Sequence, residues 1–245
     1  MIIYVDNHSS LPRGEVRDAL GAIDRQIQRD FSPTWGLSAS LVLLRKGQSL
    51  QVPPDGKVAH IHLMDHGQAI GFHIEEQSGI AAGFVITDLP ALTGSVAKWL
   101  TWTTALSHEV LELIADPFVN LLAKGPHPRF KGREVFHYRE VCDPVQSLVY
   151  DLDGVSVSNF VLPHYYNAVG QRGMQNDFLN SHLRAFRWVG DGVIGFWDPK
   201  VGKNGRYVEF PQAPPKSAAP QARRAKGKHA RLSRYTVPHL AHSRR

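Results

Sequence analysis

The chain has 245 residues, which is enough to bury the core of one sizeable domain or two small ones. Its single cysteine, Cys142, excludes an intrachain disulfide and a thiolate-rich zinc cluster, so a metal site here needs histidine and carboxylate ligands. The net charge of +6 belongs to the end of the chain. Nine of the 28 basic residues and none of the 22 acidic ones follow Glu209, which leaves residues 1–210 with 19 basic residues and a net charge of −3.

Short strands and one amphipathic helix are predicted for the first part of the chain. Residues 2–5 are an apolar strand, and the apolar spacing from Arg13 to about Asp30 favours an amphipathic helix. Ser32-Pro33 is expected to end that helix, because proline interrupts helical hydrogen bonding. Further strands are predicted from apolar and β-branched residues at 37–44, 59–64, 69–74 and 80–87.

Several histidines fall on these strands or beside them: His60, His62, His66 and His73. Alternate residues of a strand point to the same face, so His60 and His62 share one face. Their alternation with Ile61 and Leu63 is typical of a half-buried strand with one solvated face. We prefer this interpretation to a second metal site.

A long helix is predicted over residues 96–116, because no Gly or Pro interrupts it, Ser95 can cap its start and Pro117 stops it. The rest of this helix is apolar, but one arc of about 100° carries ionisable side chains at 100° per residue. These side chains are His108, Glu109, Glu112 and Asp116. Such a helix is mostly buried, and these side chains form a polar stripe (the polar seam) that faces a neighbouring part of the protein or a ligand.

The spacing of His108 and Glu112 suits a shared metal ion. Residues four apart lie one turn apart on the same face, so an imidazole and a carboxylate can bind one ion. Glu109 points to the side, where it can reach a water molecule without binding the metal. This His-Glu-x-x-Glu pattern resembles the His-Glu-x-x-His motif of the zincin superfamily of metallopeptidases, with Glu112 in place of the second histidine. The alternative is a solvated groove lined by the carboxylates, with His108 hydrogen-bonded nearby.

The resemblance implies that His108 and Glu112 bind one zinc ion and that Glu109 acts as the general base. It also implies a zincin-like α+β fold, carried mainly by residues 60–165, with a mixed β-sheet and an active-site helix. In zincins an edge strand lines the cleft and can pair with an extended substrate. The candidates for that strand are residues 67–76 and 79–87.

A third zinc ligand is expected from the segment after this helix. Glu140 lies at a distance that a loop can bridge, and thermolysin-type zincins use a glutamate in this role, followed by an aspartate that orients a ligating histidine. Asp143 fits that second part, although the Glu-x-x-Asp spacing is short. Asp143 or His164 could instead be the third ligand. Without a metal site, Glu140 would pair with Arg139 or Arg133 and Asp143 would belong to an ordinary turn.

Other polar residues have expected roles around the same site. Asp116 lies about 12 Å along the axis from His108, so it is expected to hold backbone amides or an arginine where the chain turns at Pro117. A histidine or tyrosine placed over the metal could stabilise the oxyanion that forms during peptide hydrolysis. Alternatively, these aromatic side chains cover the core and have no catalytic role. The candidates are His164, Tyr165 and Tyr166.

The second half of the chain is predicted to contain a loop, a hairpin and short strands. Residues 118–133 are rich in Gly and Pro and are expected to be a loop. Asp153-Gly154 is a tight-turn signal between the strands 148–151 and 155–158. Short strands are expected within residues 183–210. Residues 211–245 are expected to be a disordered basic tail, of which 216–245 could contact nucleic acid or an acidic surface weakly.

These features predict a single α+β domain over residues 1–210 that acts as a zinc-dependent metallopeptidase. It would hydrolyse a peptide or protein substrate through a metal-activated water molecule. Two carboxylate ligands should make that water less acidic, which favours a slower or specialised peptidase or another divalent ion. One alternative is an inactive zincin-like binding or assembly module whose tail contacts nucleic acid. Another is an α+β protein whose polar seam lines a small-molecule pocket.

The compartment is inferred from two expected absences. No apolar run is long enough for a membrane span, and the N-terminus lacks a basic region followed by an apolar core, so we expect no signal peptide. The cytoplasm is therefore the default expectation.

Overall fold

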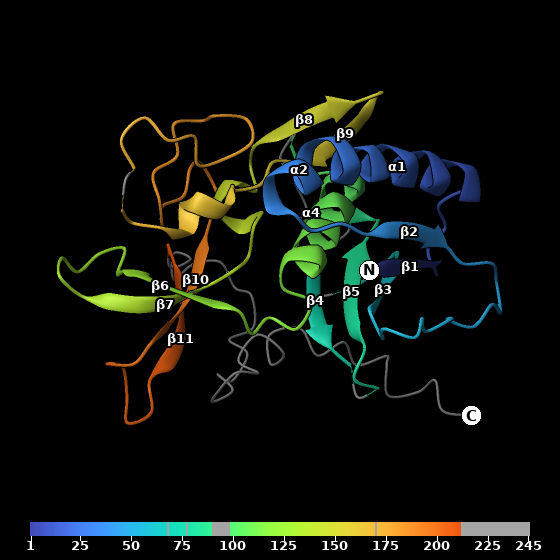
Figure 1. Cartoon of the computed structure of the whole chain (residues 1–245). Coiled ribbons are helices and arrows are strands. Elements are labelled where there is room, and N and C mark those ends of the chain that lie inside the picture. Colours follow the sequence, from blue (N-terminus) through green and yellow to red (C-terminus); the bar gives the residue numbers. More distant parts are fainter. Residues whose placement is uncertain (68, 77, 90–98, 170, 212–245) are drawn as a thin grey trace.

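A mixed five-stranded sheet with helices on one face forms the larger part of the fold (Figure 1). The computed structural model describes residues 1–67, 69–76, 78–89, 99–169 and 171–211. The strands are β1 (Ile2–Asn7), β2 (Ser40–Leu43), β3 (Val58–Met64), β4 (Gly71–Glu75) and β5 (Ala81–Ile86), in the order β2-β1-β3-β5-β4. β4 pairs antiparallel with β5 at one edge, and the other neighbours pair in parallel. The prediction of an α+β fold with a mixed sheet is confirmed.

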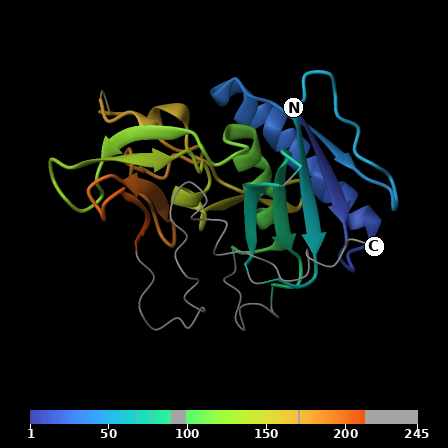
Figure 2. The same cartoon turned by 90° about the horizontal axis from the view of Figure 1, so that it is seen from below.

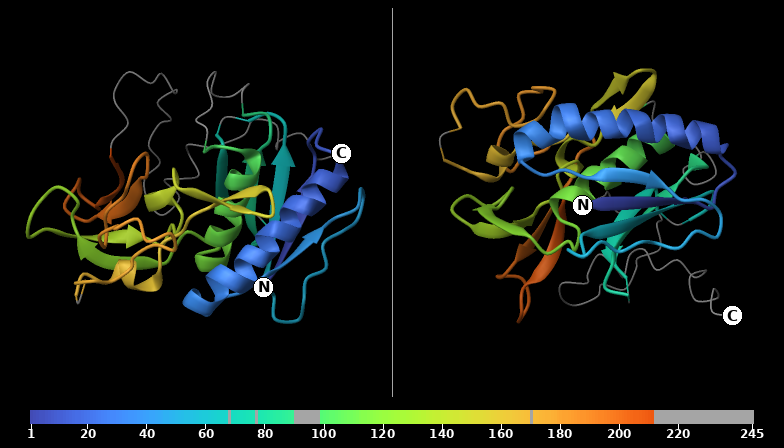
Figure 3. Two further views of the ribbon diagram at one scale, coloured as in Figure 1. Left: turned by 90° about the horizontal axis from the view of Figure 1, so that it is seen from above. Right: turned by 45° about the vertical axis from the view of Figure 1, so that its right-hand side comes forward.

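Strand alternation gives this sheet two different faces. Two helices, α1 (Arg13–Arg25) and α4 (Trp102–Ala115), pack on the face formed by Ile3, Ile61 and their neighbours. These helices lie in front of the strands in the view from above (Figure 3, left). They lie behind the strands in the view from below (Figure 2). Because β5 is paired on both sides, the prediction that residues 79–87 form an edge strand is wrong. The other candidate, residues 67–76, contains β4, which is an edge.

The first helical segment extends further than predicted. After α1 it continues as a π-helical turn, η1 (Gln26–Phe31), and as α2 (Ser32–Trp35). The prediction that Ser32-Pro33 ends the helix is therefore wrong, because proline is tolerated in the first turn of a helix. The segment closes at Gly36, whose φ of 65° is the left-handed conformation that glycine adopts readily.

α4 begins later than predicted, at Trp102. Thr101 and Thr104 form a capping box, in which the Thr101 side chain accepts from Thr104 N at 3.1 Å and Thr101 N donates to Thr104 Oγ1 at 2.9 Å. Ser95, the expected cap, lies outside the described residues. Residues 99–101 are described and are not helical, so the helix that carries His108 does not reach back to Ser95.

A second, antiparallel sheet follows α4 and lies beside the first (Figure 1). Its strands are β6 (Leu122–Pro126), β7 (Glu134–Tyr138), β10 (Ile194–Asp198) and β11 (Arg206–Phe210), in the order β11-β10-β7-β6. β6 contradicts the prediction of a loop over residues 118–133. It is an edge strand, where proline costs little because one side of the strand needs no hydrogen bonds. β10 and β11 confirm the short strands expected within residues 183–210.

The predicted hairpin is present as β8 (Val149–Leu152) and β9 (Val155–Ser158). Asp153 and Gly154 both have positive φ, as a tight hairpin turn requires. No helix in the described part of the chain has the length and apolar character needed to cross a membrane. Of the tail predicted for residues 211–245, all but Pro211 lies outside the described residues.

Buried hydrogen bonds hold α4 between η1 and the hairpin. Ser107 Oγ donates to Gln26 Oε1 at 2.7 Å and accepts from Ser158 N at 3.0 Å. Gln26 Nε2 also donates to the Ser158 carbonyl oxygen at 2.8 Å. Because these groups satisfy one another inside the core, they fix the rotation of α4 about its axis. This rotation sets the directions of the side chains of His108, Glu109 and Glu112.

The second sheet gives a testable pH dependence. His137 on β7 is buried between the rings of Phe186 and Phe196, and its Nε2 contacts the Pro126 carbonyl oxygen at 3.0 Å. Burial lowers the pKa of His137 from 6.5 to about 4. The unfolded chain then binds more protons than the folded chain between these two pH values. The contribution of His137 to stability should be complete above pH 6.5 and should decrease by about 3 kcal/mol as the pH falls to 4.

Chemical denaturation at several pH values tests this expectation. His137→Gln keeps a donor for the Pro126 carbonyl but cannot titrate, so its free energy of unfolding should fall less between pH 7 and pH 4 than that of the wild type. An equal fall in both proteins would show that His137 does not carry the effect.

Candidate metal centre

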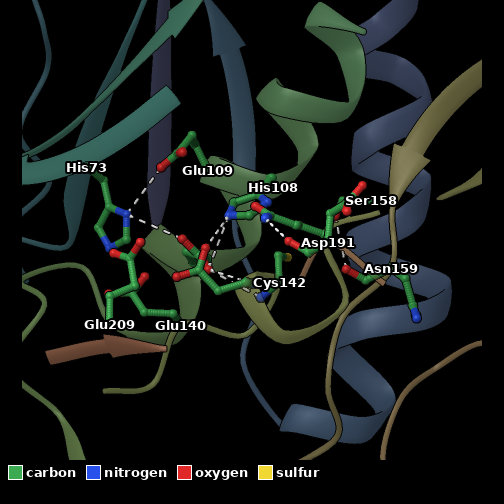
Figure 4. A network of polar contacts seen from close by, with 12 residues as sticks. His73, His108, Glu109, Glu140, Cys142, Ser158, Asn159, Asp191 and Glu209 are labelled. Carbon is green, nitrogen blue, oxygen red and sulfur yellow. Dashed lines mark hydrogen bonds and ion pairs between the residues drawn. The ribbon is translucent and has the colours of Figure 1, made fainter. Parts of the chain in front are cut away.

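α4 presents three ionisable side chains to the space between β4 and the segment that follows β7. His108 Nε2 lies 3.3 Å from Glu112 Oε1, one helical turn further along. The next residue, Glu109, is turned sideways toward β4, where it meets His73 (Figure 4). The side chains of Glu112 and Glu109 are only 1% and 6% exposed, whereas that of His108 is 15% exposed. The pair with the predicted spacing of four is therefore in contact, and His108 forms its more accessible side.

The segment after β7 brings a second carboxylate to His108. A short 3-10 helix, η2 (Asp143–Val145), begins there, and Asp143 Oδ1 lies 3.4 Å from His108 Nε2. The backbone N–H groups of Cys142 and Asp143 donate to Glu112 Oε1 at 3.2 and 3.4 Å, which ties this segment to α4. One ligand atom each from His108, Glu112 and Asp143 lies within 4.8 Å of the other two. Small side-chain rotations would bring all three around one ion.

Glu140 is buried near the same cluster but is not one of these three converging residues. It is 3% exposed, and its backbone carbonyl accepts a hydrogen bond from the Tyr166 hydroxyl at 3.1 Å. Its charge acts on both His73 and Glu112, so it belongs to the same electrostatic environment. Its assignment as the third ligand stays a prediction. Asp143, the alternative, is the residue that the distances favour.

His73 is a member of the cluster that the sequence analysis did not identify. It lies on β4, with Nδ1 3.2 Å from Glu109 Oε2 and 3.7 Å from Glu112 Oε2. Its Nε2 lies 3.2 Å from the carbonyl oxygen of Asp116, which can only accept, so Nε2 carries a proton. Strand alternation was the signal that could have found it, because Phe72 packs on the opposite face and His73 therefore points toward α4.

A glycine makes room for this contact. Gly71 precedes His73 by two residues and so shares its face of β4. A Cβ atom at Gly71 would lie 2.7 Å from Glu109 Oε1, closer than carbon and oxygen atoms approach in folded proteins. The Glu109 carboxylate can therefore lie against the backbone of β4 only because residue 71 has no side chain.

Burial and neighbouring carboxylates decide which groups in the cluster carry protons. Burial opposes the charged form of His73, but Glu140, Glu109 and Glu112 outweigh it and raise the pKa of His73 to about 9. Burial likewise opposes the charge on His108, and Glu112 and Asp143 raise its pKa well above the ordinary value. Burial raises the pKa of Glu112. The metal-free cluster thus retains protons that a bound cation would displace.

The donor set fits a divalent metal. His108, Glu112 and Asp143 offer one imidazole and two carboxylates, a combination that binds zinc and related ions. Four carboxylates in the region are at least nine-tenths buried, and buried negative charge is costly unless a cation or protons compensate it. These residues are Glu109, Glu112, Glu140 and Asp143. A cation between His108 and the carboxylates would compensate much of this charge.

The other predicted residues lie at the margin of the cluster. Asp116 caps the end of α4, where its carboxylate accepts from Asn120 N at 3.0 Å and Leu121 N at 2.9 Å. Tyr165 is 1% exposed and donates to the Arg187 carbonyl oxygen at 2.8 Å. His164 contacts the Gln175 carbonyl oxygen. Among the described contacts, neither Tyr165 nor His164 touches His108.

Comparison of the chain with models of protein families, with characterised proteins and with solved structures finds no match. The resemblance to zincins therefore stays a prediction from the His-Glu-x-x-Glu pattern.

The cluster makes a spectroscopic prediction. In metal-free protein the imidazole of His73 should stay protonated up to about pH 9, because three carboxylates stabilise its charge. Glu109→Gln removes the bonded carboxylate and should lower that pKa. Nitrogen NMR of the histidine rings measures both values, with His137 as an internal reference whose pKa is shifted the other way. Ordinary titration of His73 near pH 6.5 in both proteins would contradict the arrangement.

Proposed function

We propose that this chain is a zinc-dependent metallopeptidase whose metal is held by His108, Glu112 and Asp143. One observation carries the proposal: ligand atoms from α4 and η2 lie within 4.8 Å of one another, directly beside a carboxylate on the same helix that can act as a base. Three protein ligands would leave a fourth position for water or substrate, as in catalytic zinc sites. A divalent ion bound there would polarise a substrate carbonyl and make a water molecule more acidic.

Glu109 is the general base in this proposal. Its carboxylate would accept a proton from the attacking water and pass it to the leaving amine nitrogen as the peptide C–N bond breaks, which yields a carboxylate and an amine. His73 acts as a positioning residue. Nδ1 of His73 contacts Glu109 Oε2 at 3.2 Å, and Nε2 of the same ring contacts the Asp116 carbonyl oxygen. The Glu109 carboxylate therefore cannot rotate freely.

The edge strand supports a peptide as the substrate. Among the described strands, β4 has a sheet neighbour only on its β5 side, so its other side offers backbone groups with which an extended peptide could pair. His73 lies in the middle of β4 and touches Glu109. A peptide paired along β4 would thus lie close to the base.

A second candidate is a zincin-like module that binds a metal without catalysis. The small space around the cluster favours this second candidate. Glu112 is 1% exposed, and the pocket beside Glu140 and Asp143 is about the size of one water molecule. In that case the ion would stabilise the packing of α4 against η2, and no substrate would need to enter.

Elemental analysis of the purified, tag-free chain tests the metal site. The wild type should bind zinc, and His108→Ala, Glu112→Ala and Asp143→Ala should each lose one equivalent, because each removes a ligand. His66→Ala, at an exposed histidine outside the cluster, is the control and should lose none. Zinc content that is unchanged in all three ligand variants would overturn the site.

Peptide cleavage separates the two candidates. In a peptide-library assay Glu109→Gln should keep its zinc but cleave at least about 100-fold more slowly than the wild type, because it lacks the base. A wild type that holds zinc at His108 and cleaves no peptide would favour the non-catalytic module.

A further inference from the structure

A second group of metal-binding side chains lies on the opposite face of the five-stranded sheet. The parallel register of β1 and β3 places Asp6 beside His62 and Tyr4 beside His60. These residues alternate with Val5 and Ile61, which face the helices and the main core. Asp6, His60 and His62 therefore lie on the face of the sheet opposite α1 and α4.

The three side chains converge. One ligand atom each from Asp6, His60 and His62 lies within 4.8 Å of the other two, and the ring centroids of the two histidines are 3.8 Å apart. His8, one residue after β1, closes the group on its exposed side. Its Nε2 lies 3.1 Å from Asp6 Oδ2 and 3.3 Å from His62 Nδ1.

Nε2 of His60 and Nε2 of His62 are buried, and neither atom has a hydrogen-bond partner in the described part of the chain. The carboxylate of Glu76 is a charged neighbour, with its Oε1 3.5 Å from His62 Nε2, but no hydrogen bond joins these two atoms. Buried polar atoms are normally satisfied, so two adjacent exceptions on neighbouring rings require an explanation.

A metal ion bound at these nitrogen atoms would provide that explanation. Imidazole nitrogens and a carboxylate oxygen are the ligands of zinc, nickel and copper sites. The alternative, a solvated strand face, does not account for unbonded nitrogen atoms that are shielded from water.

We propose that Asp6, His60 and His62 form a second site for a divalent transition metal such as zinc, with the remaining position open to water or to His8. The ion would tie β1 to β3, two adjacent strands of the five-stranded sheet, and would stabilise the sheet from the face opposite α1 and α4. This site replaces the interpretation of His60 and His62 as a solvated strand face. It does not depend on the proposed peptidase activity.

Zinc titration of the tag-free full chain by calorimetry tests the proposal. The wild type should bind two ions per chain, and His62→Ala and Asp6→Asn should each bind one. Asp6→Asn preserves the shape of the side chain, and circular dichroism verifies that each variant is folded. His66→Ala, at an exposed histidine just after β3, should still bind two.

Thermal melts provide a second readout. Because an ion that binds only the folded state raises the Tm, zinc should raise the Tm of His108→Ala but not that of the double variant His108→Ala with Asp6→Asn. The two sites can fail separately. Loss of an ion in His62→Ala but not in His108→Ala would support this site and overturn the other one. Unchanged stoichiometry in both His62→Ala and Asp6→Asn, or no zinc in the wild type, would overturn this proposal.

Discussion

Compensation of buried negative charge is the constraint on which the centre of this structure depends. Glu109, Glu112, Glu140 and Asp143 are all at least nine-tenths buried around α4, where two histidines face them. Carboxylates in such an environment need protons, hydrogen bonds or a cation. The raised pKa values of His73 and His108 show how the metal-free chain meets this need. A divalent ion would meet it without protons, which is why we interpret the cluster as a metal centre.

The surrounding fold keeps the charged groups in place. The Ser107, Gln26 and Ser158 hydrogen bonds fix the rotation of α4, and the backbone of Cys142 and Asp143 fixes one oxygen of Glu112. On the other side, β4 approaches α4 closely at Gly71 and delivers His73 to Glu109. The site is thus assembled from one helix, one edge strand and one short turn, each held by its own contacts.

Local patterns predicted much of the fold, and non-local contacts decided what they missed. The hairpin followed from Asp153-Gly154, and the contact of His108 with Glu112 follows from a spacing of four on one helix. β6 was missed because its Gly and Pro are typical of loops, and only pairing with β7 makes it a strand. Alternation along β4 indicates the face on which His73 lies, but its contact with Glu109 and the contact of Asp143 with His108 depend on tertiary packing. For the same reason the sequence could not distinguish Glu140 from Asp143 as the partner of His108.

The most direct test of the metal centre is X-ray diffraction at the zinc absorption edge, using crystals of the chain prepared with zinc. The anomalous difference map should contain a peak at about 2.0–2.2 Å from His108 Nε2 and from carboxylate oxygens of Glu112 and Asp143. A map without a peak at His108, from crystals in which zinc is present in excess, would contradict the account.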